Sequence, residues 1–177
     1  MPRAPWEGPP RGLDAVLARW TARGAVRDCL VADAQQPARP ARMCPLPAGL
    51  DPRLARALVD RGVRELYSHQ ARAFEFATAG FHTVFATPTA SGKSLCYNLP
   101  VAQALAESPT ARALYLFPTK ALARDQEANL RAFLQSAGLD VSASVFDGDT
   151  PGDHRRAIRA RGGAVLSNPD MLHAGVL

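Results

Sequence analysis

The eight residues from Thr87 to Ser94 read Thr-Pro-Thr-Ala-Ser-Gly-Lys-Ser, and their types and order suit the binding of a phosphate group. Small side chains let a loop backbone approach a triphosphate closely, so that a concave row of N–H groups can donate to its oxygens. The helix that we expect after the loop adds the partial positive charge of its N-terminus. In such a loop Lys93 contacts the β- and γ-phosphates, and the Ser94 hydroxyl ligates Mg²⁺. We therefore predict a catalytic role for Lys93 and a magnesium-binding role for Ser94.

The loop departs from the strict phosphate-binding pattern at two positions. Thr87 stands where that pattern has glycine, six positions before the lysine, and Ala90 stands where a second glycine is common. The alternative is a chance Gly-Lys-Ser at the start of a helix. The apolar segment 83–86 favours the first interpretation, because it predicts a strand directly before the loop. The loop residues that we expect to bind a nucleoside triphosphate, which the resemblance described below implies is ATP, are Thr87, Pro88, Thr89, Ala90, Ser91, Gly92, Lys93 and Ser94.

Length and composition indicate a globular chain with one main domain. The 177 residues are 47% hydrophobic and 21% charged, which is enough apolar content for a buried core. No apolar run approaches the ~18 residues of a membrane span, and the N-terminus lacks an apolar signal segment. Cys29, Cys44 and Cys96 are scattered and match neither a disulfide framework nor a zinc site. We expect a monomeric, cytoplasmic protein with no membrane partner.

The charge of the chain is compatible with a nucleic-acid partner but does not require one. The net charge is +5, and a high arginine content can produce such a balance without any binding role. The four histidines show no spacing that is typical of metal ligands.

The first 49 residues differ from the rest in composition. Residues 1–12 are rich in proline and predict a disordered tail. Residues 13–49 predict an extension followed by a Pro-rich linker, and residues 50–177 form the main domain. The elements expected within the extension and linker are a short helix that starts at Leu13, a strand at 29–32 and an extended segment at 35–48.

Two helices are predicted before the loop, and a third after it. Asp51 is a good N-cap, a proline follows it at the first helical position, and Gly62 can close the helix. Ser68 is expected to cap the next helix, which ends at Gly80. Pro100 lies inside the helix after the loop, where we expect a kink or an early end because proline has no N–H to donate.

Strands and helices alternate in the second half of the chain. Apolar runs at 113–117, 141–146 and 164–166 predict strands, and a helical face that ends at Gly138 separates the first two. Repeated units of this kind predict an α/β fold with a parallel sheet and helices on both faces. Ligands bind at the carboxyl ends of the strands in such sheets. The loops expected at this common edge are 87–94, 117–126, 146–151 and 166–171.

The ordered sequences of these loops are TPTASGKS, FPTKALARDQ, FDGDTP and LSNPDML, and they resemble motifs I, Ia, Ib and Ic of the superfamily-two DEAD/DEAH-box helicases. Upstream, the segment 66–70 (Leu-Tyr-Ser-His-Gln) is similar to the adenine-reading Q motif of that family. The wording resembles the DEAH-type DNA repair helicases of the RecQ-four-like branch, which includes bacterial enzymes with a C-terminal zinc-binding domain. The resemblance covers about residues 50 to 177. It implies a RecA-like domain with a phosphate loop, in a 3′-to-5′ DNA helicase that uses ATP and Mg.

The resemblance gives Gln70 and Tyr67 their expected roles. A glutamine amide can donate to one adenine nitrogen and accept from another. The family pattern therefore implies that Gln70 selects ATP, with Tyr67 as a stacking neighbour of the base. The alternative for Gln70 is a partly exposed side chain in the first turn of a helix.

The resemblance also implies that the other loops contact single-stranded or partly duplex DNA. Thr119 and the charge of Lys120 suit a phosphate, although many family members have arginine in place of this lysine. In the acidic loop that follows, the backbone N–H groups of Gly148 and Thr150 are better candidates than the carboxylates. For each loop the alternative is ordinary turn or capping chemistry. The residues expected to contact the strand without reading bases are Pro118, Thr119, Lys120, Gly148, Thr150, Asn168 and Pro169.

Two parts that ATP hydrolysis requires are not found in the sequence. One is an Asp-Glu pair at a later strand end, and the other is an arginine finger, which in this family comes from a second RecA-like domain. Six residues follow Met171, and no Asp-Glu-x-His sequence occurs. We expect a fragment of a longer ATP-dependent DNA helicase, truncated before the DEAH strand and lacking the second RecA-like domain and C-terminal regions. The parent is expected to be an ATP hydrolase, and the fragment alone to have little activity.

Two other functions stay open. A non-catalytic nucleic-acid-binding or interaction module would retain these loops but bind a strand regardless of ATP. A phosphate-loop kinase or another ATPase would need an acceptor-binding lid, and no segment of the sequence is a candidate for one.

Overall fold

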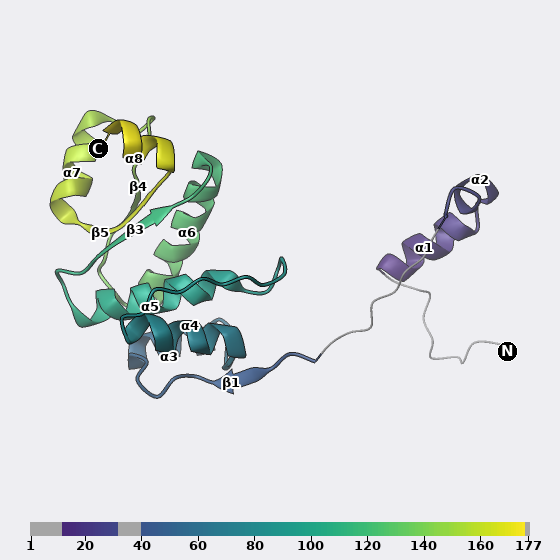
Figure 1. Cartoon of the computed structure of the whole chain (residues 1–177), viewed down its shortest axis with the longest axis horizontal. Helices are drawn as coiled ribbons and strands as arrows, with labels where there is room; N and C mark the ends of the chain where they lie inside the picture. The colour runs from purple at the N-terminus through teal and green to yellow at the C-terminus, as the bar shows by residue number, and fades with distance from the viewer. Residues whose placement is uncertain (1–11, 32–39, 176–177) are drawn as a thin grey trace. The chain divides into compact units, whose positions relative to one another are not determined.

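The structure is a computed structural model, and it describes residues 12–31 and 40–175 (Figure 1). The chain divides into two units, residues 1–40 and 41–177. Most of the predicted tail and part of the predicted linker lie outside the described residues. Within the described ranges, every helix is too short or too polar to cross a bilayer.

Two short helices lie in the described part of the first unit, residues 12–31. The predicted helix is confirmed as α1 (Leu13–Thr21), and α2 (Gly24–Arg27) follows it. The predicted strand at 29–32 is wrong for its described part, because the N–H groups of Cys29 and Leu30 donate back to the carbonyls of α2. Its last residue, Ala32, lies outside the described residues.

The second unit is built on a parallel sheet with the strand order β3-β5-β4. β3 (Arg112–Leu116) and β4 (Ala143–Val145) both pair in parallel with β5 (Gly163–Ser167). Tyr115 of β3 lies opposite Leu166 of β5. These are the strands that the apolar runs predict, although β4 is shorter than expected. The predicted α/β fold with a parallel sheet is therefore confirmed.

Helices lie against both faces of this sheet. Tyr115 and Leu166 point to the face that joins the core with α5 (Lys93–Glu107) and α6 (Lys120–Ser136). Because strand side chains alternate, Leu114 and Val165 point to the other face. There they line a hollow with residues of α7 (Gly152–Arg161) and α8 (Pro169–Gly175).

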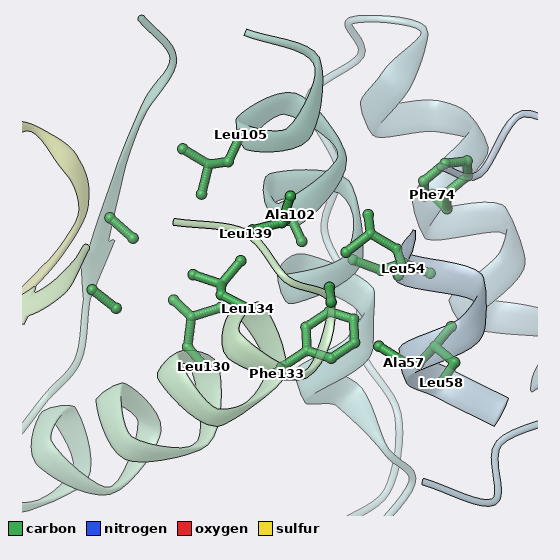
Figure 2. Packing of buried hydrophobic residues seen from close by; sticks show 14 of the residues in the cluster. Leu54, Ala57, Leu58, Phe74, Ala102, Leu105, Leu130, Phe133, Leu134 and Leu139 are labelled. Carbon is green, nitrogen blue, oxygen red and sulfur yellow. The ribbon is translucent and has the colours of Figure 1, made fainter. Parts of the chain in front are cut away.

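The core gathers side chains from α5, α6 and α3 (Pro52–Asp60) into one cluster, as Figure 2 shows. Leu54 and Leu58 of α3 are buried, and so are Leu130 and Phe133 of α6. Full burial of a side chain of this size contributes about 1.5–3 kcal/mol. This cluster fixes the helices whose N-termini carry the candidate site.

Side-chain caps set the starts of two of these helices, as predicted. The Asp51 carboxylate accepts from the Arg53 N–H at 2.8 Å, and the Thr119 hydroxyl accepts from the Leu122 N–H at 3.2 Å. Each bond satisfies an N–H group that has no partner in the first helical turn.

The start of α4 (Ser68–Thr78) differs from the prediction by one residue. Tyr67, not Ser68, is the N-cap, because the Tyr67 N–H donates to the Gln70 Oε1 atom at 2.9 Å. Tyr67 also ends β2 (Glu65–Tyr67), which pairs in antiparallel fashion with β1 (Met43–Pro45). The predicted extended linker therefore contains a strand, and these three-residue strands are too short for a periodicity to indicate them.

Pro100 does not end α5, so the predicted early end is wrong. The helix runs to Glu107. Leu99, Ala102 and Leu105 are buried around the proline, and their packing holds both halves of the helix against the core.

The strand predicted at 83–86 is also wrong. Residues 81–88 have irregular backbone, and Val84 is 96% exposed. A strand needs ladder hydrogen bonds to a neighbour, and no strand in the described ranges pairs with this segment.

Candidate nucleotide and nucleic-acid interface

The loop 87–94 lies at the N-terminus of α5, as predicted, and it folds around the ammonium group of Lys93. The Nζ atom donates to the carbonyl oxygens of Thr87 at 2.9 Å and Pro88 at 2.5 Å. It also lies 3.4 Å from the Ser91 hydroxyl, which pairs with the Thr87 hydroxyl at 2.6 Å. The cation is therefore positioned inside the loop.

The backbone of this loop presents donors. From Ser91 to Ser94, no backbone N–H donates a hydrogen bond to any residue in the described ranges. These groups begin a helix of 15 residues, where the helix dipole places partial positive charge. The Ser94 side chain is exposed beside them. The arrangement offers N–H donors, a cation and a hydroxyl to one anion.

Two residues of the loop have left-handed backbone. Ala90 has φ 59° and Gly92 has φ 73°. A Cβ atom at Gly92 would lie 2.6 Å from the Gln70 Nε2 atom, so this position requires glycine for both conformation and space. Ala90 adopts a conformation that costs an L-residue about 1–2 kcal/mol. The departure from glycine at Ala90 is therefore accommodated with strain.

Gln70 is buried against the loop, and the alternative of a partly exposed side chain is wrong. Its Nε2 atom donates to the Gly92 carbonyl at 2.8 Å, and its Oε1 atom accepts from Tyr67. The amide therefore joins the start of α4 to the start of α5. Tyr67 is 39% exposed, which leaves part of its ring open for stacking.

His69 is a contact that the sequence did not indicate. Its Nε2 atom lies 2.9 Å from the Ser91 carbonyl, to which it donates because a carbonyl oxygen only accepts. The imidazole ring stacks on Tyr67 with centroids 5.6 Å apart. The only signal in the sequence was its place beside Gln70.

The second group of candidate residues follows the carboxyl ends of the three strands. Pro118 and Thr119 come after β3, and Lys120 is the first residue of α6. The Lys120 ammonium group lies 3.1 Å from the Asp149 carboxylate. A Cβ atom at Gly148 would lie 3.5 Å from the same ammonium nitrogen. The loops after β3 and β4 therefore meet, as predicted.

The loop after β4 is a tight turn. The Thr150 N–H donates to the Asp147 carbonyl at 3.2 Å, and the Thr150 hydroxyl donates to the Asp147 carboxylate at 3.1 Å. Of the two predicted donors, Thr150 is thus used inside the turn. The Gly148 N–H donates to no residue in the described part of the chain, and it stays available.

Asp147 organises this turn and is only 2% exposed. Burial alone would raise the pKa of its carboxyl group. The pKa is nevertheless lowered, because the Asp149 N–H, the Thr150 hydroxyl and the Arg124 guanidinium group favour the charged form. The Arg124 side chain comes from α6, and its Nη2 atom lies 3.3 Å from Asp147 and 3.1 Å from Asp149.

The loop after β5 has the capping chemistry that was the alternative interpretation. The Asn168 Oδ1 atom accepts from the Met171 N–H at 2.8 Å, and Pro169 is the first residue of α8. Ser167, the last residue of β5, ties the three strand ends together. Its carbonyl accepts from the Phe117 N–H at 2.9 Å, and its hydroxyl donates to the Phe146 carbonyl at 2.6 Å.

The candidate residues thus form two groups. One surrounds the start of α5, and the other lies along the carboxyl edge of the sheet. Helix packing joins them, because the Tyr97 hydroxyl of α5 donates to Gln126 of α6 at 3.1 Å. The predicted common edge therefore holds for the loops after β3, β4 and β5. The loop 87–94 is attached through its helix, since the strand expected before it is absent from the sheet.

The parallel sheet, with helices on both faces and a lysine-containing loop at a helix N-terminus, resembles a RecA-like helicase domain. The sequence pattern of the DEAD/DEAH box helicases matches residues 67–177. The chain belongs to the DEAD/DEAH box helicase family.

The chain is similar to longer helicases. It is 49% identical over 139 residues to the uncharacterized ATP-dependent helicase YprA of Bacillus subtilis. The matched region covers 78% of this chain and 19% of YprA. It is 40% identical over 119 residues to the ATP-dependent helicase hrq1 of Schizosaccharomyces pombe, covering 66% of this chain and 11% of that protein. The crystal structure of the helicase MrfA bound to DNA and AMPPNP superposes with a TM-score of 0.76 and 48% identity, over 78% of this chain and 19% of that one.

Proposed function

We propose that this chain is the N-terminal part of the first motor domain of an ATP-dependent DNA helicase. In this proposal the loop 87–94 binds ATP with Mg, and the loops after β3, β4 and β5 bind the phosphates of a DNA strand. The parent belongs to the RecQ-four-like branch, with a C-terminal zinc-binding domain and a role in DNA repair. These finer assignments rest on the wording of the motifs.

The observation that carries the nucleotide assignment is the donor row from Ser91 to Ser94 around the Lys93 ammonium group. The residues fit a triphosphate: the N–H groups of the row can donate to phosphate oxygens, Lys93 can neutralise their charge, and the exposed Ser94 hydroxyl suits Mg²⁺. Bound Mg²⁺ would neutralise charge on the phosphates. Gln70 and Tyr67 stand beside the loop, where they would select and stack the adenine base.

The strand assignment rests on the group at the sheet edge. Lys120 supplies a cation, Gly148 supplies an N–H, and Thr119 and Asn168 fix the helix starts on either side. None of these groups has the geometry of a base-edge pair, so the binding is expected to be independent of sequence and sensitive to salt.

The relatives support both parts of the proposal. MrfA has been crystallised with DNA and AMPPNP, and the related proteins YprA and hrq1 are named as ATP-dependent helicases. Because the chain spans 19% of MrfA and of YprA, unwinding activity belongs to the proposed parent. The free cysteines Cys29, Cys44 and Cys96 support a reducing, cytoplasmic location. We further propose that the chain is monomeric.

The test is a salt titration of strand binding. The affinity of the 177-residue chain for a fluorescent oligo-deoxythymidylate is measured with and without Mg-ATP, for the wild type and for Lys120→Ala. We expect the logarithm of the affinity to fall linearly with the logarithm of salt concentration, and Lys120→Ala to reduce that slope by about 0.7.

The same titration separates the proposal from a non-catalytic binding module. A motor domain changes its strand affinity when Mg-ATP binds, whereas a passive module does not. Strand affinity that is indifferent to nucleotide and to Lys120 would contradict the proposal.

A further inference from the structure

Arg155 of α7 donates hydrogen bonds to the backbone carbonyls of the turn after β4. Its Nε atom donates to the Thr150 carbonyl at 2.9 Å. Its Nη2 atom donates to the carbonyls of Asp147 at 3.0 Å and Gly148 at 3.2 Å. The guanidinium carbon also lies 5.6 Å from the centroid of the Phe146 ring. One half-buried side chain therefore binds three carbonyl groups of a four-residue turn.

These contacts fix the direction of the one available donor in the turn. In a trans peptide, the C=O of one residue and the N–H of the next point in opposite directions, and the described residues contain no cis peptide bond. Because Arg155 holds the Asp147 carbonyl, the Gly148 N–H must point away from Arg155. The ammonium group of Lys120 lies beside Gly148.

We propose that Arg155 is a positioning residue, which orients the Gly148 N–H to donate to a phosphate oxygen of the bound strand. This inference rests on the proposed strand site. It assigns Arg155 an indirect role, since its guanidinium group is occupied by the turn while the phosphate is bound by Gly148 and Lys120.

The next residue provides a matched control. Arg156 carries the same charge on the same helix, but its side chain is 80% exposed and, among the residues that the structure describes, pairs only with the exposed Asp153. Substitution of either arginine removes one positive charge near the strand site. Only substitution of Arg155 releases the carbonyls of the turn.

The experiment measures binding of oligo-deoxythymidylate by the 177-residue wild type, Arg155→Ala, Arg155→Lys and Arg156→Ala over a range of salt concentrations. We expect Arg155→Ala to bind about tenfold more weakly, the value of one oriented hydrogen bond to a charged group, with an unchanged salt slope. Arg156→Ala should bind within about twofold of the wild type. In ¹⁵N–¹H spectra, the strand should shift the Gly148 amide signal of the wild type but not that of Arg155→Ala.

Several outcomes would overturn this inference. Equal affinities of Arg155→Ala and Arg156→Ala would remove the positioning role. A salt slope reduced by about 0.7 in Arg155→Ala would instead make Arg155 a direct phosphate contact. If Arg155→Ala unfolds, Arg155→Lys tests the proposal, because lysine keeps the charge but cannot donate to all three carbonyls. Weakened strand binding by Arg155→Lys would support the positioning role, and wild-type affinity would contradict it.

The controls also separate this inference from the proposed function. If the wild type binds the strand, and if Lys120→Ala weakens this binding while Arg155→Ala does not, only the role of Arg155 fails. If the wild type does not bind, the strand site and the positioning role both fail.

Discussion

Side chains at the strand site compete with the phosphate that they would bind. Lys120 pairs with Asp149, and both side chains are about half exposed. Exposed ion pairs contribute only about 0.2–1 kcal/mol, so a phosphate can displace the carboxylate. Asp149 therefore acts as a weak internal competitor for the Lys120 ammonium group.

Removal of this competitor should strengthen strand binding. We expect Asp149→Asn to bind oligo-deoxythymidylate about two- to fivefold more tightly at low salt, which corresponds to an exposed ion pair. Asp153→Asn is the matched control, because it removes one carboxylate of the adjacent helix that pairs with Arg156. An equal gain in both variants would reveal a general charge effect and remove the role of the Lys120–Asp149 pair.

The lowered pKa of Asp147 predicts how stability depends on pH. Because the folded-state pKa lies below the unfolded value of about 3.9, the ionised carboxylate contributes stability above pH ~4. This contribution is lost as the pH falls through the folded pKa. Asp147→Asn should therefore unfold more easily in urea at pH 7, by about 1–3 kcal/mol.

The acid-dependent part of the stability should shrink in the same variant. Urea unfolding of the wild type and Asp147→Asn across the range below pH 5 measures this difference. Parallel pH profiles for the two proteins would show that the buried carboxylate does not contribute as described.

The junction of α4 with α5 joins the segment 66–70, which we propose reads adenine, to the loop 87–94, which we propose binds phosphates. Gln70 crosses it from α4 to the Gly92 carbonyl. A side chain at Gly92 would collide with this amide, so the junction depends on a position without Cβ.

A comparison of Gly92→Ala with Gly80→Ala tests the contact between Gly92 and Gln70. Both glycines end or begin a helix with positive φ, but a Cβ atom at Gly80 meets nothing within 4 Å. Both variants should lose about 1–2 kcal/mol from the backbone. Only Gly92→Ala should also displace Gln70 and weaken Mg-ATP binding, which calorimetry measures. Similar nucleotide affinities for the two variants would contradict the role of the junction.

The elements that the sequence predicted well are those with local signals. Asp51 and Thr119 cap their helices with their own side chains, and the apolar runs of β3 and β5 are read directly as buried strands. The elements that it missed depend on distant partners. β1 and β2 exist because they pair with each other across the 19 residues that separate them, Met43 with Tyr67 and Pro45 with Glu65. The segment 83–86 has strand composition but no paired neighbour among the described strands.

In the candidate site, too, the sequence predicts what depends on local signals and misses what depends on contacts formed by folding. The position of Lys93 at a helix start follows from the pattern Gly-Lys-Ser alone. The contacts of His69 and Arg124 arise from packing between elements more than 20 residues apart in the chain, and those of Arg155 arise where α7 folds back onto the turn before it. No spacing in the sequence encodes such contacts, so only the folded structure reveals them.

Among the described strands, β3 and β4 are the two edges of the sheet, and we expect the β3 edge to influence the behaviour of the chain in solution. Leu114 and Leu116 are 56% and 45% exposed, and β3 pairs with β5 alone among the described strands. An apolar strand edge can pair with another chain. We therefore expect the proposed monomer to associate through this edge only at high protein concentration.

Leu116→Lys should reduce this association, because a charge on an edge strand opposes pairing between chains. Leu122→Lys is the control: Leu122 is 38% exposed but belongs to α6 and not to β3. Light scattering over a range of protein concentrations measures the effect. Equal behaviour of the two variants would show that the β3 edge does not drive association.

The two groups of candidate residues form one functional surface only if the loop at the start of α5 binds a nucleotide. Calorimetric titration of the 177-residue protein with Mg-ATP, compared with Lys93→Ala, tests this claim most directly. We expect binding by the wild type and a loss of at least about tenfold in Lys93→Ala, since that variant removes a charged hydrogen-bond donor to the phosphates. Equal affinities of the two proteins would contradict the phosphate-loop assignment.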